Sequence, residues 1–227
     1  MMKNFLKFIM IATIIMGMSA AASAKDFKGV ITYKITYPGM DVDPSMAAMM
    51  PKMAIMSIAG NKSKMEISMG QMGSQIQITD GDEKTVTTVM DMMGQKFYYI
   101  ESEDEIKADK PDPEKISVEV TDETKEIAGY ECKKAIITLK DQGEDMVFTI
   151  FFTEEIGTSD LNFDNPLFEQ IPGAMLEFEI DTGRNQRMKM EAVSVKKTNV
   201  SDKEFQVPEG YEKKTSEEVM QMLGGGM

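Results

Sequence analysis

Methionine is the residue type whose number and spacing most suggest chemistry in this sequence. The chain has 24 methionines, and a dense group of them is Met46, Met49, Met50, Met53 and Met56. Soft thioether sulfurs at such spacing could bind Cu(I), which makes the stretch from Met40 to Met56 a candidate copper site. Two other interpretations stay open, because methionine also serves as a general apolar filler and can line a concavity that accepts varied apolar ligands.

The residues that usually carry enzymatic chemistry are missing or uninformative. The chain has no histidine, which excludes Ser-His-Asp and Cys-His catalysis, histidine-ligated zinc or haem, and HExxH proteases. It also has no GxSxG, GxGxxG or Walker motif. Paired carboxylates could act on glycosides, but with 38 acidic residues the proximity of any two is uninformative. We therefore expect a protein that is not an enzyme and that uses no cofactor or metal.

Two further features have ordinary structural explanations. The acidic turn at residues 80–83 could touch Ca²⁺, but it lacks the longer ligand series of an EF-hand loop, so we interpret it as a hairpin turn. Cys132 is the single cysteine, so it cannot form an internal disulfide, and no histidine is present to activate its thiol. We expect Cys132 to be a small buried apolar residue.

The start of the chain has the pattern of an export signal. Two lysines precede an apolar run, and the small residues 22–24 are typical of a cleavage site. The apolar run is shorter than the roughly 20 residues that a spanning helix needs, and no later stretch is apolar enough. We therefore expect residues 1–24 to be a signal peptide cleaved near Ala24. Residues 25–227 should then form a single β-rich domain, in the periplasm or secreted, with no membrane span.

The negative net charge of the chain limits the kinds of molecule that it can bind. The formal net charge is −13, and so acidic a surface should repel nucleic acid and anionic lipid headgroups. We expect no nucleic acid as a partner, and the sequence does not predict an oligomeric state.

The elements that would position these residues are mostly strands. Apolar residues alternate with polar ones over residues 27–37, 62–69, 116–121 and 174–181, which is the period of a half-buried strand. Turn signals recur at intervals of about ten residues, a spacing typical of an antiparallel meander. We predict a mainly β fold: a single curved antiparallel sheet, or a half-open barrel, of about ten strands with a few short helices.

Several segments between the predicted strands have their own patterns. Residues 44–50 and 215–222 should form short helices. Residues 101–114 form a charged loop, and residues 122–126 should connect two strands ahead of a tight turn at Gly129. The stretch from residue 154 to 172 is less regular, and we expect a loop with one helical turn, laid over the sheet.

Three short motifs carry a resemblance to known proteins. They are residues 126–137 around the single cysteine, the hairpin at residues 60–66, and the turn at residues 171–173. Together they resemble secreted domain-of-unknown-function proteins of the Gram-negative envelope, and the last motif is similar to the pattern of the GLPGLI family. The resemblance covers nearly all of the chain after the signal peptide and implies no activity. It implies a fold similar to the outer-membrane lipoprotein carriers, a curved antiparallel sheet with helices in its concave side.

These considerations predict an exported, non-enzymatic binding or carrier-like protein that holds a lipid or another apolar ligand in a methionine-rich concave sheet. Binding would depend on shape and apolar burial, with no covalent step. The expected lining, named from strand parity, is Tyr33, Ile35, Met46, Met49, Met65, Ile67, Phe97, Phe148 and Phe178. Two alternatives remain: a Cu(I)-binding or copper-tolerance protein that uses the cluster from Met40 to Met56, and an envelope structural protein without a ligand.

Overall fold

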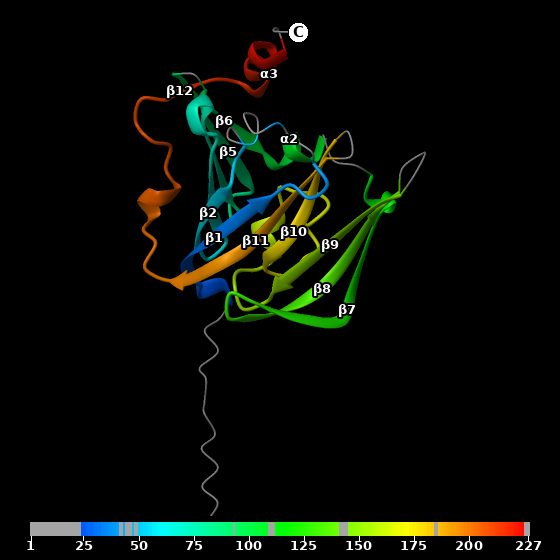
Figure 1. The fold of residues 1–227 in the computed structure, drawn as a ribbon. Coiled ribbons are helices and arrows are strands. Elements are labelled where there is room, and N and C mark those ends of the chain that lie inside the picture. Colours follow the sequence, from blue (N-terminus) through cyan, green and yellow to red (C-terminus); the bar gives the residue numbers. More distant parts are fainter. Residues whose placement is uncertain are drawn as a thin grey trace, which may run out of the picture.

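The computed structural model describes residues 24–40, 43, 47, 50–92, 94–108, 112–140, 145–183 and 186–224. These residues form one open sheet of twelve strands in the order β12-β6-β5-β4-β3-β2-β1-β11-β10-β9-β8-β7 (Figure 1). The predicted fold class is confirmed, and the sheet is not closed into a barrel. The predicted signal peptide, apart from Ala24, and most of the predicted helix at residues 44–50 lie outside the described residues.

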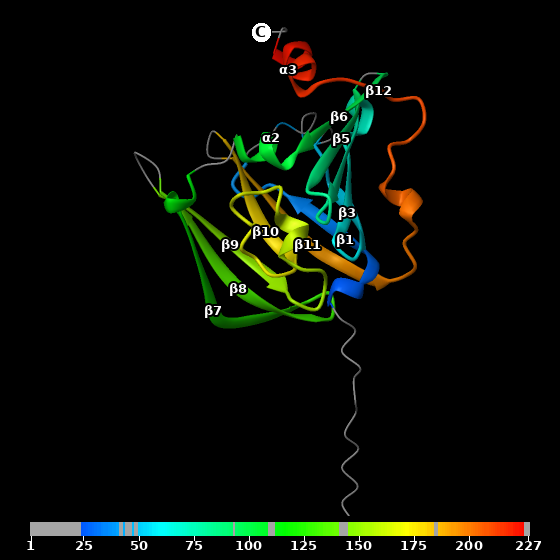
Figure 2. The same cartoon turned by 180° about the vertical axis from the view of Figure 1, so that it is seen from behind.

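The sheet consists of two meanders. The strands are β1 (Lys28–Thr36), β2 (Met53–Ala59), β3 (Lys62–Ser68), β4 (Gly73–Asp80), β5 (Thr85–Met92), β6 (Gln95–Ser102), β7 (Ile116–Ile127), β8 (Tyr130–Leu139), β9 (Met146–Thr153), β10 (Ala174–Gly183), β11 (Gln186–Lys197) and β12 (Glu212–Lys213). Neighbouring strands are antiparallel, except that β12 runs parallel to β6. Strands β1 to β6 form one meander and β7 to β11 the other. They join where β1 pairs with β11, which we call the seam, at the centre of the molecule (Figures 1 and 2).

Irregular pairing bends this sheet. The register shifts within the pairs β1–β11, β9–β10 and β7–β8. An extra residue in one strand of a pair increases the local twist and bends the strand. One face of the sheet is therefore concave, and most of the hydrophobic core lies on that face.

The centre of the chain differs from its prediction. The sequence predicts a connection at residues 122–126, but these residues belong to β7, and β8 begins after a two-residue turn. Ala128 and Gly129 form that turn with φ of 50° and 85°, the left-handed backbone of a tight hairpin. Because the turn is so short, strand pairing extends through the polar stretch, and a register shift between Val120 and Thr124 accommodates it.

Two short helices follow strands or turns with clear start signals. The predicted charged loop at residues 101–114 contains α2 (Glu103–Ala108), which the sequence analysis missed. Ser102 precedes it, and its N–H and hydroxyl donate to the Glu105 carboxylate at 2.8 and 2.6 Å, the arrangement of a capping box. The second predicted helix is confirmed as α3 (Ser216–Gly224).

The segment of residues 154–173 lies against the concave face, as predicted, and it contains one 3₁₀ turn, η4 (Ser159–Asn162). We call it the crossing segment. Its apolar side chains join the core formed by the strands: Ile156, Leu161, Phe168 and Ile171. Burying these side chains against the sheet fixes a segment that has little regular structure of its own.

The chain after β11 runs along the outside of the first meander (Figure 1). A 3₁₀ turn, η5 (Asp202–Phe205), contacts β3, where Lys64 and Glu204 form an ion pair at 3.4 Å. The chain then adds β12 to the edge of β6, and α3 packs beside β6 (Figures 1 and 2). None of the helices in the described part of the chain has the length and hydropathy to span a bilayer.

Candidate functional site

The concave face changes from apolar to polar along the sheet. Strand register places Met65 of β3 beside Gln77 of β4, and Gln77 beside Thr88 of β5. Thr88 is in turn beside Tyr99 of β6. Because directly opposite residues lie on the same face of a sheet, this row runs from a thioether to amide, hydroxyl and aromatic side chains. The first meander therefore carries polar groups on its concave face over β4, β5 and β6.

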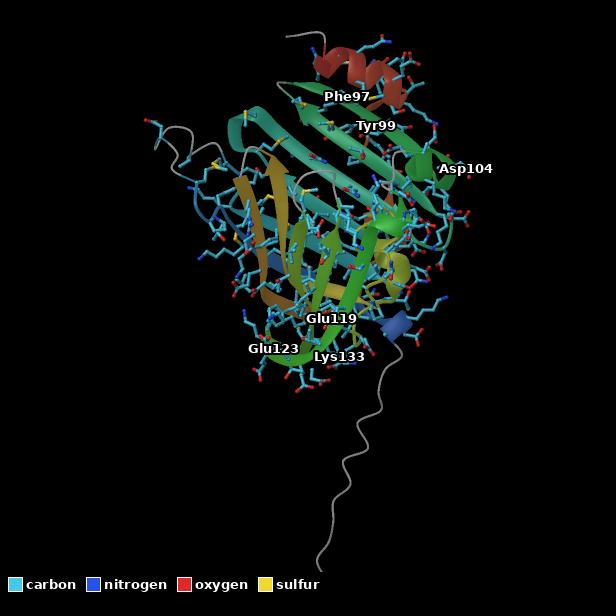
Figure 3. All side chains as sticks on the ribbon, turned by 90° about the vertical axis from the view of Figure 1, so that its right-hand side faces the viewer. Phe97, Tyr99, Asp104, Glu119, Glu123 and Lys133 are labelled. Atoms are coloured by element: carbon cyan, nitrogen blue, oxygen red, sulfur yellow. The ribbon has the colours of Figure 1, made fainter. Side chains whose placement is uncertain are left out.

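A groove of about 320 Å³ lies on this polar part, and we call it the polar groove. Strands β4, β5 and β6 line it together with α2 and the crossing segment. The lining residues are Gln75, Gln77, Val86, Thr88, Tyr99, Glu101, Ile106, Asp164 and Pro166. Figure 3 shows Tyr99 on β6, between Phe97 on the side of α3 and Asp104 on α2. The groove thus presents amides, a hydroxyl, carboxylates and an aromatic ring.

A smaller, apolar cavity of about 190 Å³ adjoins the groove, and we call it the methionine cavity. Its thioether side chains are Met56, Met65, Met175, Met188 and Met190. Tyr33 and Phe178 also line it and meet edge to face, with ring centroids 6.1 Å apart. The Tyr33 hydroxyl donates to the carbonyl oxygen of Met175 at 2.9 Å, so its polar end is satisfied in an apolar setting.

Gln77 and Asp164 line both spaces and stand between them. The side-chain amide of Gln77 donates to Asp164 Oδ2. The Thr79 hydroxyl donates to the same oxygen at 3.3 Å. Hydrogen bonds to a carboxylate are stronger than bonds between neutral groups. We call the bonded pair of Gln77 and Asp164 the partition.

The position of Asp164 depends on a buried amide in the crossing segment. Asn162 is 6% exposed, and its side-chain NH₂ donates to the carbonyl oxygens of Ile171 and Gly173 at 3.0 and 2.9 Å. These bonds connect the two ends of the stretch that contains Asp164. A buried polar side chain needs hydrogen-bond partners, and the segment folds so that the carbonyl oxygens of Ile171 and Gly173 provide them for Asn162.

The acidic turn at residues 80–83 anchors the same segment. Asn61 is buried; its amide donates to Asp82 Oδ1 at 2.9 Å, and its Oδ1 accepts from the Thr158 hydroxyl at 2.9 Å. Lys84 contacts Asp160 at 2.6 Å, and this hydrogen bond lowers the pKa of Asp160, although burial opposes the shift. The turn therefore fixes the crossing segment. No three His, Cys, Asp or Glu side chains among the described residues are grouped to hold a metal ion.

The predicted lining residues are distributed over several places. Tyr33, Met65, Ile67 and Phe178 lie together around the methionine cavity. Ile35 and Phe148 are buried in the core, away from either space. Phe97 is buried on β6, near α3. Met46 and Met49 lie outside the described residues.

The polar groove was not predicted from the sequence. Gln75, Gln77 and Thr79 alternate along β4, and Thr88 and Tyr99 continue the pattern on β5 and β6. Polar residues that alternate along a strand usually lie on its solvent-exposed face. Their position on the concave face therefore could not be predicted from this pattern. A signal did exist, because the hairpin turns fix the register and align Gln77 with Met65.

Cys132 behaves as expected from the sequence. Its side chain is fully buried in the core. Burial raises the pKa of the Cys132 thiol to about 11, and the nearby Glu155 carboxylate adds to this effect. The thiol is therefore protonated at neutral pH and has little nucleophilic character.

Comparison with known proteins gives one clear result. A protein family described as "N-glycanase peptide, N-terminal domain" matches residues 45–219. The matched range includes all strands of the sheet except β1, the crossing segment, the whole lining of the polar groove, and the lining of the methionine cavity apart from Tyr33. No curated protein matches the chain.

The family match overturns the resemblance drawn from the three short motifs. The chain is not a GLPGLI-type protein of unknown function, and no finding supports a fold-level likeness to outer-membrane lipoprotein carriers. The motifs misled because each contains a glycine with positive φ. Gly60 and Gly129 lie in hairpin turns with φ of 66° and 85°, and Gly173 directly precedes β10 with φ of 117°. Unrelated antiparallel sheets need glycine at such positions.

The predicted carrier function is wrong as well. The family points to glycans and not to a lipid or other apolar cargo. The alternatives, Cu(I) handling and an envelope structural role, have no support either. Met53 and Met56 of the proposed copper cluster sit on β2 three positions apart, so they project from opposite faces. Met53 is exposed and Met56 lines the methionine cavity.

Proposed function

We propose that this chain, which belongs to the family of N-glycanase peptide N-terminal domains, binds the glycan part of glycoproteins without cleaving it. The observation that supports the proposal is the polar groove, which combines hydrogen-bonding side chains with the ring of Tyr99 on the concave face. Such a domain would hold a glycan-bearing chain for a catalytic domain or a separate enzyme.

The chemistry of the groove suits a neutral saccharide. Sugar hydroxyls both donate and accept hydrogen bonds. Amide groups at Gln75 and Gln77 and the hydroxyl of Thr88 also do both, and the carboxylate of Glu101 accepts. The faces of sugar rings expose C–H groups, which pack against an aromatic ring such as Tyr99. Val86, Ile106 and Pro166 add apolar contacts beside these polar groups, and such a combination is typical of a small-molecule site.

The proposal includes no catalytic step. Enzymes that cleave glycosidic bonds commonly use a pair of carboxyl groups, one as an acid and one as a base or nucleophile. One of the groove's carboxylates, Asp164, already accepts hydrogen bonds from Gln77 and Thr79 and maintains the partition. Its role in this proposal is to shape the groove and to accept hydrogen bonds from the ligand.

Glycan binding can be tested directly with a matched pair of tyrosine variants. Neutral oligosaccharides released from an N-glycosylated protein should bind the whole chain, measured by calorimetry or by NMR titration. Tyr99→Ala should weaken binding at least tenfold, because stacking on an aromatic ring is lost. Tyr98→Ala is the control, since Tyr98 is the adjacent residue of β6 and points to the opposite face.

Two outcomes would contradict the proposal. Absence of measurable binding to any of the released oligosaccharides would remove the glycan-binding function. Release of free glycan from a glycopeptide incubated with the pure chain, abolished in Tyr99→Ala but not in Tyr98→Ala, would show that the domain is catalytic.

We also propose that the protein acts after export, in the periplasm or outside the cell. The support is the signal-like pattern of residues 1–24, with small residues before the expected cleavage point. Amino-terminal sequencing of protein recovered from its native host should then begin at Lys25. A chain that retains its first residues and stays in the cytoplasm would contradict the proposal.

A further inference from the structure

The twelve-stranded sheet has two edges, and they differ in how they are covered. At one edge β12, which is two residues long, pairs with β6, and α3 packs beside that strand. At the other edge lies β7, which is twelve residues long and pairs, among the described residues, with β8 alone (Figures 1 and 2). A long unpaired edge is a template for another strand, so the outer side of β7 is a candidate interaction surface.

The first five residues of β7 are the part that can accept such a strand. The register shift between Val120 and Thr124 interrupts the strand at one end, and irregularities of this kind end pairing along an edge. At the other end lies the 3₁₀ turn η3 (Pro113–Lys115), whose first residue has no N–H to donate. The usable stretch therefore runs from Ile116 to Val120, and we call it the edge segment.

The backbone groups of the edge segment alternate in direction. The N–H of Lys140 donates to the carbonyl oxygen of Lys115 at 2.8 Å, so these opposite residues form a hydrogen-bonded pair. Bonded and non-bonded pairs alternate along an antiparallel ladder. The N–H and C=O groups of Ile116, Val118 and Val120 therefore point away from β8.

The side chains of the same three residues make this edge apolar on its core side. On β8 they lie opposite Leu139, Ile137 and Ala135. Ile137 and Ala135 are fully buried in the core, and directly opposite residues share a face. Val120 is nevertheless 50% exposed, because β7 is the last strand of the sheet. A further strand would cover it.

We propose that a second copy of this chain pairs with the edge segment, antiparallel and about a two-fold axis at Val118. The three outward residues of one copy are then opposite those of the other, so each outward N–H and C=O finds a partner. Val118 meets its own copy, and Ile116 meets Val120 of the second copy. Apolar side chains are thus paired with apolar side chains.

The polar side chains on the other face of the strand favour the same register. Ser117 lies directly opposite Glu119 of the second copy, and Lys115 of the second copy is a diagonal neighbour of Glu119. Moving the axis to Glu119 would place this carboxylate opposite its own copy, which is destabilising. Moving the axis to Ser117 would leave Val120 outside the paired region. The edge segment is therefore self-complementary in one register.

This dimer joins the two sheets edge to edge. Because core-side side chains of both copies meet on one face, the two concave faces open to the same side. The interface is small, so association should be weak, and the negative net charge of each chain opposes it. Measurements therefore belong at about 0.15 M salt, which screens this repulsion.

Sedimentation equilibrium of the whole chain measures the association. The average mass should rise by at least half between about 1 µM and about 1 mM protein. Hydrogen exchange followed by NMR should slow at least twofold at the N–H groups of Ile116, Val118 and Val120 between about 50 µM and about 1 mM. The N–H groups of Ser117 and Glu119 face β8 and should not change.

Three substitutions test the register. Val118→Pro removes an outward N–H that β8 does not use, so the chain should stay folded and the association should be lost. Ser117→Lys places a cation opposite Glu119 of the second copy and should tighten association at least threefold, whereas Ser117→Glu should weaken it by a similar factor. Val147→Lys is the control: Val147 is 56% exposed on the inner strand β9, and the change should alter association less than twofold. Thermal unfolding verifies that each variant is folded.

Several results would overturn the proposal. They are a single-chain mass at every concentration, association that survives in Val118→Pro, and equal effects of Ser117→Lys and Ser117→Glu. Protection of the three outward N–H groups that does not depend on concentration would show that a segment of the same chain covers the edge. Protection that requires the addition of another protein would assign the edge to a different partner. Either result would also exclude the second copy as the occupant.

Discussion

The buried amide of Asn162 offers a sharp test of how the crossing segment is held. Its NH₂ group donates to the carbonyl oxygens of Ile171 and Gly173 at 3.0 and 2.9 Å. Asn162→Ala removes both bonds. Asn162→Asp keeps the shape of the side chain but, when ionised, places an acceptor oxygen where the donor Nδ2 stood, facing both carbonyl oxygens.

The expected losses follow from these contacts. A hydrogen bond contributes about 1 kcal/mol to stability, so Asn162→Ala should lower the free energy of unfolding by about 2 kcal/mol. The Ile171 oxygen keeps a second donor, the N–H of Gly173 at 3.1 Å, which prevents a larger loss. Asn162→Asp at pH 7 additionally buries a charge without a partner, and its loss should reach about 3–5 kcal/mol.

The pH dependence has a definite sign. Burial and the two facing carbonyls disfavour the charged carboxylate, so the introduced carboxyl has a raised pKa in the folded state. Below about pH 4 the group is protonated in both states and the extra loss is absent. As pH rises from there through the raised folded pKa, the folded state holds the proton longer than the unfolded chain, and stability falls. Asn162→Ala should show no such trend.

Urea unfolding followed by circular dichroism at pH 7 and pH 4 measures these differences. Asn165→Ala is the matched control, because its Oδ1 accepts one local N–H, that of Leu167 at 3.1 Å, and its removal should cost about 1 kcal/mol. The reasoning would be refuted if Asn162→Asp were no less stable than Asn162→Ala at pH 7, or if its loss were the same at both pH values.

Two further predictions concern other parts of the core. Glu177 accepts from Lys125 and from Lys189; burial opposes ionisation, but these bonds dominate and lower its pKa. Its contribution is therefore present above pH 5 and lost as pH falls through the lowered folded pKa. Glu177→Gln should cost about 1 kcal/mol at pH 7 in urea unfolding, and this cost should shrink steadily as pH falls below about 4; a cost that does not change with pH would contradict this. The Cys132 thiol should react with a disulfide reagent at least a hundredfold faster in denaturant than in the native protein, since it is buried with a pKa of about 11; similar rates would show that the core opens readily.

The strands were predictable because their pattern is local. Side chains of residues 27–37 alternate between a buried face and a more exposed face, and β1 forms there. The turn at Gly129 was also visible in the sequence, since glycine tolerates its positive φ. The strand β12 was not visible, because Glu212 and Lys213 are exposed and charged, and only the path of the preceding segment brings them to β6.

The site was predictable in part, for a geometric reason. Parity assigns a residue to a face but does not place it along a sheet of twelve strands. Tyr33 lies on the seam strand β1 and Phe178 on β10, next to the seam strand β11, and their rings meet. Phe97 lies on the distant strand β6, and Phe148 lies on β9 in the core, so neither lines the methionine cavity. The partition escaped detection because Asp164 belongs to the crossing segment, whose path depends on Asn162 and the acidic turn.

The seam between β1 and β11 has a consequence for biogenesis. The strand Lys28–Thr36 leaves the ribosome long before its partner Gln186–Lys197 is translated. Until then, the first half-sheet has an unsatisfied backbone edge along β1, and such edges invite association with other chains. A chain of this design must stay unfolded or chaperoned until β11 is available, and truncations before β11 should aggregate instead of yielding a smaller stable fragment.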